Sequence, residues 1–317
     1  MDEATFAAPL WAWAAVGGVI AVMLAVDMLS HRDNHVIELR EALLWSGVWI
    51  TAGLTFGLVI WLWRGGEPAV AYFSGYLLEK ALSVDNVFVF ALLFGYFRVP
   101  AEYQHKVLFW GVVGALAFRL AFIFAGAELL GRLTWAGVVL GGFLIWTGWR
   151  LAVRGEPDVD PDRNVAVRVF RRLVPTEPRY HGGRFTVRVD GRRRATLLLV
   201  ALVAIEATDV VFAIDSVAAI LAITTDTFLV WTATAFAVLG LRSLYFCLAG
   251  LLRHFGYLRY GLAVLLAFAG AKLILAETPV GKLPVWSTLA VVVSTLSVAI
   301  GWSVFAARRE RRRRAGG

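Results

Sequence analysis

Two short acidic stretches lie inside long apolar runs, where a carboxylate is costly and is by default a candidate functional group. The stretches align with an offset of 130 residues, which places Asp209 on Glu79 and Asp215 on Asp85. Oxygen-rich segments related in this way predict the two halves of one cation site. Its candidate ligands are Glu79, Asp85, Asn86, Glu206, Asp209, Asp215 and Ser216.

The five acids among these ligands need compensation in a membrane. At about 2.5–3.5 kcal/mol for each acid, they would together cost on the order of 12–17 kcal/mol at the bilayer centre. A structural interpretation pairs them with Lys80, Arg119 and Arg242. Five acids in two related clusters against three basic residues favour a functional site instead. We expect Arg119 and Arg242 to act as counter-charges, with Arg242 neutralising acids of one of the two stretches. Asp27 is interpreted as an interface residue.

The candidate ligands are all oxygen atoms, which suit Mn²⁺, Ca²⁺ and Mg²⁺. The single cysteine, Cys247, excludes a cysteine-rich metal site, and the five histidines fall in predicted loops. A membrane metalloenzyme would need an exposed nucleophile or a ligand set with histidine, so the sequence predicts no enzyme. It contains no nucleotide-binding motif, and no organic cofactor is expected.

Helix geometry places these ligands on different faces. In a regular helix Glu79 and Asn86 share a face, whereas Asp85 points about 120° away, and the second stretch has the same spacing. The sequence therefore predicts a local break in each stretch that lets the acids converge. Discontinuous helices are common at the ion sites of transporters.

The elements that position the stretches are membrane spans. Hydrophobic residues are 59% of the chain and the mean hydropathy is +0.71, which predicts an all-α polytopic membrane protein. We expect nine spans. They are residues 10–29, 41–62, 70–96, 107–127, 134–153, 194–222, 228–250, 258–276 and 286–306.

Sequence similarity between the two parts of the chain extends beyond the acidic stretches to whole spans. The segment around Arg119 resembles that around Arg242, and the one ending in Arg150 resembles the one ending in Lys272. Spans 3–5 therefore repeat as spans 6–8, and an offset of three spans makes the repeat inverted. The predicted units are two N-terminal spans (1–66), the first repeat (70–153), a basic loop (154–193), the second repeat (194–277) and the last span with a basic tail (286–317).

Basic residues predict the orientation. Of the 31 Lys and Arg residues, 24 fall on one side of the spans, three fall on the other and four lie within spans. The positive-inside rule makes the first side cytoplasmic, with the N-terminus outside and the tail inside. The net charge of +8 is thus explained by topology, and nucleic-acid binding is not expected. In the cytoplasmic loop, Asp190 and Gly191 predict the turn of a β-hairpin after residues 185–189.

The acidic stretches closely resemble the signatures of the TerC/Alx family of integral membrane proteins. The resemblance also covers residues 236–246 and 260–264 and spans nearly the whole chain. It implies a nine-span architecture, Mn²⁺ export and an older association with tellurium resistance, and it carries the family's acidic positions onto the seven candidate ligands. The chain departs from the family at Leu197 and Ala218, where proline is usual.

These observations predict a bacterial inner-membrane secondary transporter that exports divalent cations, most plausibly Mn²⁺, with protons as the coupling ion. Its partners would be the lipid bilayer, the cations and protons; no oligomeric state is predicted. The alternative is a tellurium-resistance or stress protein that acts as a scaffold, without transport of its own, through loop 154–193.

Overall fold

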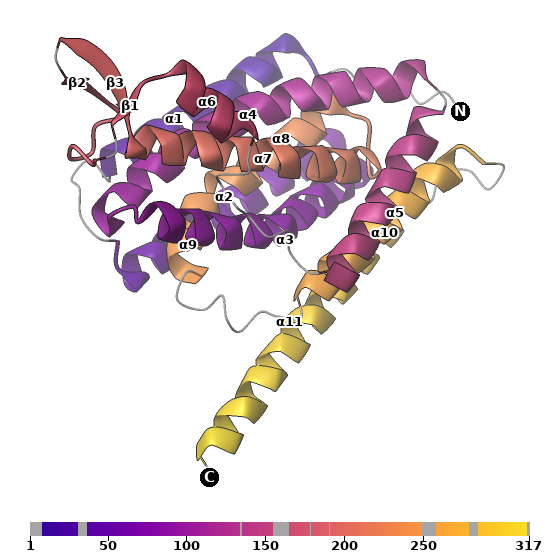
Figure 1. The fold of residues 1–317 in the computed structure, drawn as a ribbon. Coiled ribbons are helices and arrows are strands. Elements are labelled where there is room, and N and C mark those ends of the chain that lie inside the picture. Colours follow the sequence, from indigo (N-terminus) through magenta and orange to yellow (C-terminus); the bar gives the residue numbers. More distant parts are fainter. Residues whose placement is uncertain are drawn as a thin grey trace.

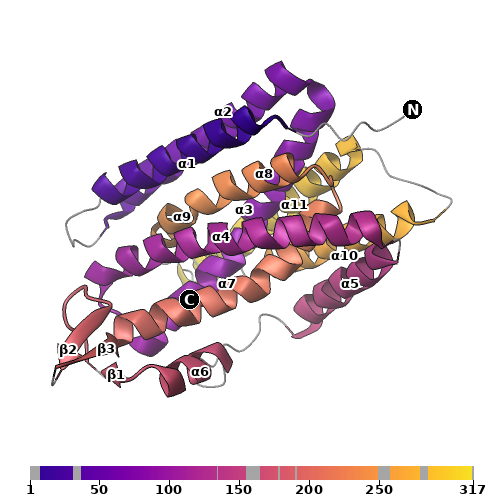
Figure 2. The same ribbon diagram turned by 90° about the horizontal axis from the view of Figure 1, so that it is seen from above.

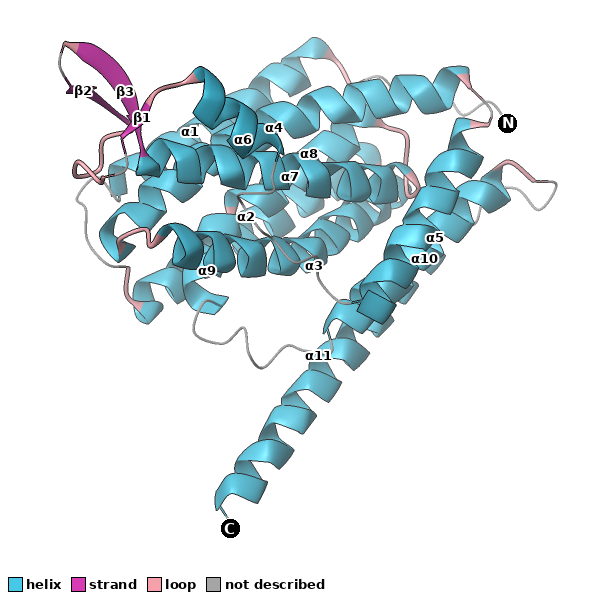
Figure 3. Cartoon of the chain, viewed as in Figure 1, coloured by secondary structure: helices cyan, strands magenta, loops and turns pink. Residues whose placement is uncertain are grey.

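The computed structural model describes residues 8–30, 37–133, 135–154, 165–177, 179–189, 191–248, 258–278 and 285–315. Inside the third helix, the side chains of Val84, Asp85 and Phe88 lie outside this description. The described residues are mainly helical, and the strands gather at one end of the molecule (Figure 3).

Eleven helices and three strands form in these ranges. The helices are α1 (Leu10–Ser30), α2 (Leu39–Arg64), α3 (Gly66–Phe97), α4 (Ala101–Arg132), α5 (Ala136–Arg154), α6 (Val165–Leu173), α7 (Leu197–Leu221), α8 (Thr227–Leu239), α9 (Leu241–Leu248), α10 (Leu258–Ala276) and α11 (Val285–Ala315). The strands are β1 (Thr176–Glu177), β2 (Thr186–Val189) and β3 (Arg192–Thr196).

Six helical segments of the described chain are long and apolar enough to cross a membrane: α1, α2, α4, α5 to Val153, α7 and the segment Thr227–Cys247. Helix α3 has the length but carries Glu79, Lys80 and Asp85 near its middle. The apolar parts of α10 and α11 are shorter, Tyr260–Ala276 and Trp286–Ala299. The chain is therefore an all-α polytopic membrane protein in which every predicted span contains a helix.

The predicted breaks in the third and sixth spans are wrong. Helix α3 runs without interruption through residues 79–87, and α7 does so through residues 206–217. Neither stretch contains Gly or Pro, and an unbroken helix keeps every backbone hydrogen bond satisfied in an apolar environment. The helix that does break is the seventh predicted span, where Gly240 separates α8 from α9.

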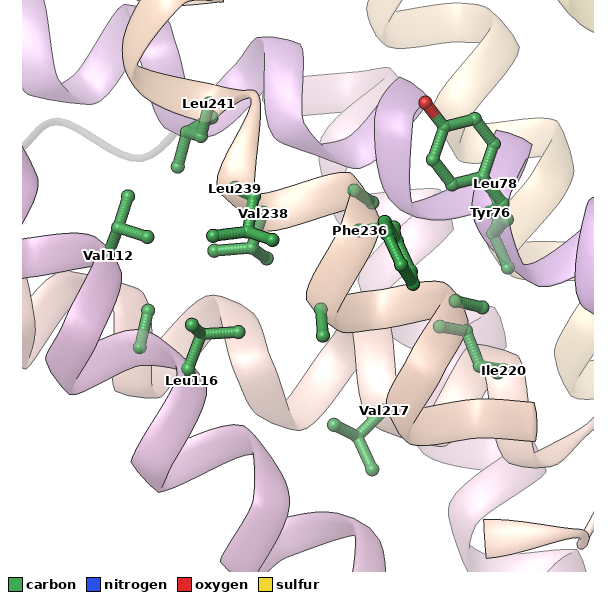
Figure 4. Close-up of a cluster of buried hydrophobic side chains, with 14 of the residues drawn as sticks. Tyr76, Leu78, Val112, Leu116, Val217, Ile220, Phe236, Val238, Leu239 and Leu241 are labelled. Atoms are coloured by element: carbon green, nitrogen blue, oxygen red, sulfur yellow. The ribbon is translucent and has the colours of Figure 1, made fainter. Parts of the chain in front are cut away.

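Helices α3, α4, α7 and α8 surround the centre of the molecule. Helix α3 packs closely on α8, and α4 packs closely on α7. Figure 4 shows apolar side chains from all four helices meeting between them, among them Leu78, Leu116, Val217 and Phe236. Helices α1 and α2 lie along one side of this group (Figure 2).

Helix α5 packs mainly on α10, and together with α11 these helices form a slanted group beside the others (Figure 1). The two helices approach closely because glycines meet at the crossing. A Cβ atom added to Gly141 would lie 2.5 Å from the carbonyl oxygen of Gly270, and one added to Gly148 would lie 2.7 Å from that of Ala263. Small residues at such crossings are typical of membrane helices.

The region between α5 and α7 contains the predicted hairpin and an additional helix. Strands β2 and β3 pair antiparallel, and Gly191 between them has a φ of 76°, which confirms the hairpin. Asp190, the other predicted turn residue, lies outside the described residues, as do residues 155–164. Strand β3 leads directly into α7, and the short helix α6, which was not predicted, packs against α7.

Candidate cation-binding site

A buried guanidinium joins the two acidic stretches. Arg119 of α4 donates from Nη1 to Glu79 Oε2 at 2.6 Å and from Nη2 to Asp209 Oδ1 at 3.4 Å. Glu79 belongs to α3 and Asp209 to α7, and the three side chains are 0–2% exposed. One basic residue thus pairs with an acid from each stretch, which confirms Arg119 as a counter-charge.

Three neutral polar side chains surround this ion-pair network. Arg119 Nη1 also donates to Ser216 Oγ at 3.1 Å, and Asn86 Nδ2 donates to Asp209 Oδ1 at 3.4 Å. Thr234 of α8 donates to Glu79 Oε1 at 3.4 Å. The Arg119 cluster, as we name it, consists of Glu79, Asn86, Arg119, Asp209, Ser216 and Thr234. It contains four of the seven predicted ligands.

The cluster leaves polar atoms without a hydrogen bond. Asp209 Oδ2 and Arg119 Nε are buried and have no hydrogen-bond partner among the described residues. An unpaired buried carboxylate oxygen is costly, so it is a natural position for a proton or a cation. The hydroxyl of Ser83, on the same helix as Glu79, is also buried without a partner in the described chain.

Glu206 lies one turn before Asp209 on α7 and faces α4 at Gly114. A Cβ atom added to Gly114 would overlap the Glu206 carboxylate, so a larger residue there would displace the acid from this position. Glu206 Oε2 has no hydrogen-bond partner among the described residues. Glu206 therefore approaches α4 at a different position from Arg119.

A cavity of about 260 Å³ adjoins the cluster between α3, α4, α5, α7 and α10. Asn86, Arg119 and Ser216 of the cluster line it, and so does Asp215, whose Oδ1 has no hydrogen-bond partner in the described chain. The cationic Arg150 of α5 lies within electrostatic range of Asp215 and also lines the cavity. Most of the remaining lining is apolar and aromatic.

The seven predicted ligands thus divide into groups. The Arg119 cluster brings together Glu79, Asp209, Asn86 and Ser216. Asp215 lines the adjoining cavity, and Glu206 lies beside Gly114. The side chain of Asp85 is outside the described residues. Among the side chains that are described, no three acids, histidines or cysteines stand close enough to hold a metal ion.

The partner of Arg242 differs from the prediction. Arg242 of α9 forms a buried ion pair with Asp27 of α1, whereas we expected it to neutralise acids of one of the two stretches; among the described side chains, Asp27 is the acid with which it forms an ion pair. Asp27 is 6% exposed, so its side chain is buried within the protein. The signal in the sequence was the same as for the other acids, a carboxylate inside an apolar span.

Sequence reasoning also missed how Lys80 is used. Lys80 Nζ donates to the carbonyl oxygen of Ala237 at 2.9 Å, close to the break between α8 and α9. A Cβ atom added to Gly240 would lie 2.6 Å from that ammonium nitrogen. Lys80 therefore satisfies a carbonyl near the end of α8 and belongs to the fold of this region.

Fold and site together define a class: an all-helical polytopic membrane protein with buried charges at its centre. The model of the integral membrane protein TerC family matches residues 64–312, and the chain therefore belongs to the TerC family. The matched region contains both acidic stretches and the cavity.

Three relatives show how far the similarity extends. An uncharacterised membrane protein of Myxococcus xanthus is 43% identical over 93% of this chain and 92% of its own length. Alx of Escherichia coli K12, provisionally described as a membrane-bound redox modulator, is 40% identical over 84% of this chain and 86% of its own. An uncharacterised membrane protein of Rickettsia bellii is 34% identical over 92% and 96%. No solved structure gives a significant match.

Proposed function

We propose that the chain is a secondary transporter that exports divalent cations, with Mn²⁺ as its main substrate. The observation that carries this proposal is the Arg119 cluster beside its cavity. Acids from two related stretches meet there in a buried, oxygen-rich environment. Intramembrane acids in such positions mark ion pathways in membrane proteins.

The available donors favour hard divalent ions. Carboxylates of Glu79 and Asp209 and the side-chain oxygens of Asn86 and Ser216 are the ligand types preferred by Mn²⁺, Ca²⁺ and Mg²⁺. The unpaired oxygens of Asp209, Asp215 and Glu206 supply further negative charge. Mn²⁺ itself is the expectation that comes from the family resemblance.

An inverted repeat of spans 3–5 and 6–8 is part of the proposal. In such a repeat α3 corresponds to α7, α4 to α8 with α9, and α5 to α10. A two-fold relation would make the packing of α3 on α8 equivalent to that of α4 on α7, and both pairs pack closely. It would also pair α5 with α10, as observed. One repeat moving against the other would then alternate access to the site.

The proposed topology has nine crossings, the N-terminus outside, the tail inside and the chain in the bacterial inner membrane. The uneven distribution of Lys and Arg supports it. Helices α3, α10 and α11 would be the remaining three crossings. A span that is buried in a bundle, or that carries charged residues of a site, can be less apolar than one that faces lipid. Reporter fusions that place the tail outside would overturn both the topology and the inverted repeat.

We propose protons as the coupling ion, because the same carboxylates can bind either a proton or a metal ion. Exported Mn²⁺ would leave the cytoplasm as protons enter. No adenosine triphosphate is required, in keeping with the lack of a nucleotide-binding motif in these 317 residues.

The description of Alx as a redox modulator suggests another activity. Within these 317 residues Cys247 is the single cysteine, so a thiol–disulfide exchange inside the chain is not available. The scaffold alternative places function in loop 154–193. Deleting that loop separates the two ideas, because a transporter keeps metal flux after the deletion whereas a scaffold loses its effect.

The test is metal uptake by inside-out membrane vesicles that contain the protein. We expect saturable Mn²⁺ uptake above that of vesicles without it, with Ca²⁺ and Mg²⁺ as competitors and no effect of tellurite. Vesicles with Asp27→Asn serve as a control, because this acid lies outside the cluster. Uptake equal to that of empty vesicles for all three metals would overturn the proposal.

A further inference from the structure

Arg119 takes up the positions that the proposed cargo would need. Its guanidinium contacts Glu79, Asp209 and Ser216, so three candidate ligands from both stretches already share one cation that belongs to the protein. The side chain is 1% exposed, and water cannot replace these contacts freely. An arginine remains charged at every physiological pH.

A divalent ion and this guanidinium cannot hold the same oxygens. Both would seek Glu79 Oε2 and Asp209 Oδ1, and two cations at hydrogen-bond distance in a medium of low dielectric constant repel strongly. We propose that Arg119 is a tethered cation that competes with the transported ion and leaves these carboxylates when the ion binds. This inference rests on the proposed function and specifies how its site is regulated.

The structure offers a second position for the guanidinium. Arg119 borders the cavity, and Asp215 lines the same cavity with an Oδ1 atom that has no hydrogen-bond partner in the described chain. Arg119 Nε likewise has no hydrogen-bond partner among the described residues. Moving into the cavity would bring the guanidinium toward Asp215, which already has the Thr147 side chain and the positive charge of Arg150 beside it. Asp215 then acts as the alternative partner of Arg119.

The consequence concerns the empty transporter. With no metal bound, Arg119 stays paired with Glu79 and Asp209 and offsets one of their two negative charges, so the return of the empty site needs one proton fewer on these acids. The remaining negative charge lies with Asp209, whose Oδ2 atom is unpaired among the described residues, and with acids that Arg119 does not contact, such as Glu206. Arg119, a cation that belongs to the protein, thus supplies part of the positive charge that a coupling ion brings to the empty site in other exchangers.

Mn²⁺ binding to the purified full-length protein tests the proposal. Arg119→Gln removes the competitor and should tighten Mn²⁺ binding about tenfold or more, since a favourable charge contact is no longer lost on binding. In vesicles the variant should retain Mn²⁺/Mn²⁺ exchange but lose net export, because the empty site carries unneutralised acids. Arg242→Gln is the matched control and should leave Mn²⁺ affinity unchanged, as its partner is Asp27.

Two further variants cover a failure of Arg119→Gln to fold. Arg119→Lys keeps the charge but not the forked contacts, and should tighten Mn²⁺ binding by a smaller factor. Asp215→Asn should weaken binding in the wild-type background, and by a smaller factor together with Arg119→Lys, because Asp215 acts by receiving the cation at position 119. Unchanged or weaker Mn²⁺ binding in folded Arg119→Gln or Arg119→Lys would overturn the inference alone. A wild-type protein without saturable Mn²⁺ binding would overturn the proposed function instead.

Discussion

Arg119 and Arg242 occupy corresponding segments of the proposed repeat, yet they do different work. Arg119 lies at the centre, bridges acids of α3 and α7 and borders the cavity. Arg242 pairs with Asp27 and fastens α9 to α1, a helix outside the repeat. The same residue type in related positions therefore serves the candidate site in one half and the assembly of the bundle in the other.

The local helix geometry explains the difference. Helix α4 is continuous over 32 residues, and Arg119 projects from its middle toward both acidic stretches. The corresponding span ends α8 at Leu239 and begins α9 at Leu241, which re-aims Arg242 toward α1. Lys80 stabilises that break through the carbonyl oxygen of Ala237. Of the two arginines in corresponding segments of the proposed repeat, one therefore lies at the candidate site and the other does not.

The largest effect on Mn²⁺ export is expected from substitutions of the acids at the candidate site, where Arg119 lies. Asp85→Asn and Asp215→Asn should each abolish Mn²⁺ export, a loss of about 100-fold or more, because each removes a charge from the predicted site while keeping the volume. Export is measured in inside-out vesicles after immunoblotting confirms equal amounts of protein in the membrane. Retained efflux in both variants would show that these acids are structural.

Substitution of Arg242 should change the stability of the fold and leave the metal preference as it is. Arg242→Ala leaves Asp27 as an uncompensated buried charge and should cost about 3–5 kcal/mol of stability, seen as reduced abundance and a lower Tm. Adding Asp27→Asn should restore part of this loss. The metal preference of the protein that does fold should stay as in the wild type. Normal abundance with an altered preference would place Arg242 at the site.

A moderate effect is expected from pH. Protons and Mn²⁺ compete for the same carboxylates, so Mn²⁺ binding should release protons and tighten as pH rises from about 6 to 8, by at most about tenfold per unit for each proton displaced. Calorimetry in buffers of different ionisation enthalpy measures the protons. A flat affinity with no proton release would exclude proton exchange at this site.

The smallest effect concerns the α5–α10 contact that supports the cavity wall. Gly141→Ala places a methyl group against the backbone of α10 and should cost about 1–3 kcal/mol. Gly142→Ala is the control, because a Cβ atom there meets nothing within 4 Å. The two Tm values in detergent are compared. Equal Tm values would show that the close crossing of the two helices adds nothing to stability.

Several features of the molecule could be predicted from the sequence. Apolar length predicted the helices, because a bilayer requires runs of about 20 residues. The Asp-Gly pair predicted the hairpin, and an arginine inside an apolar span predicted a counter-charge. These signals are local in the chain or depend on the strong cost of a buried charge.

Other features depend on contacts between distant helices. Helical periodicity gives the face on which Arg242 lies but not the neighbour of that face, so its pairing with Asp27 was missed. The breaks predicted in α3 and α7 assumed that all acids must converge. Arg119 instead contacts one acid of each intact helix, Glu79 of α3 and Asp209 of α7, and Asp215 of α7 lines the cavity. The long side chain of Arg119 connects the two acidic stretches, so neither helix has to break.

The most direct test of the cation site is Mn²⁺ binding to the purified protein, followed by the loss of the electron paramagnetic resonance signal of free Mn²⁺. Asp209→Asn removes an acid that touches Arg119, and Asp27→Asn removes the acid that touches Arg242. The account predicts saturable binding to the wild type and to Asp27→Asn, and a loss of at least about tenfold in affinity for Asp209→Asn. Equal binding to Asp209→Asn and the wild type, or none to either, would contradict it.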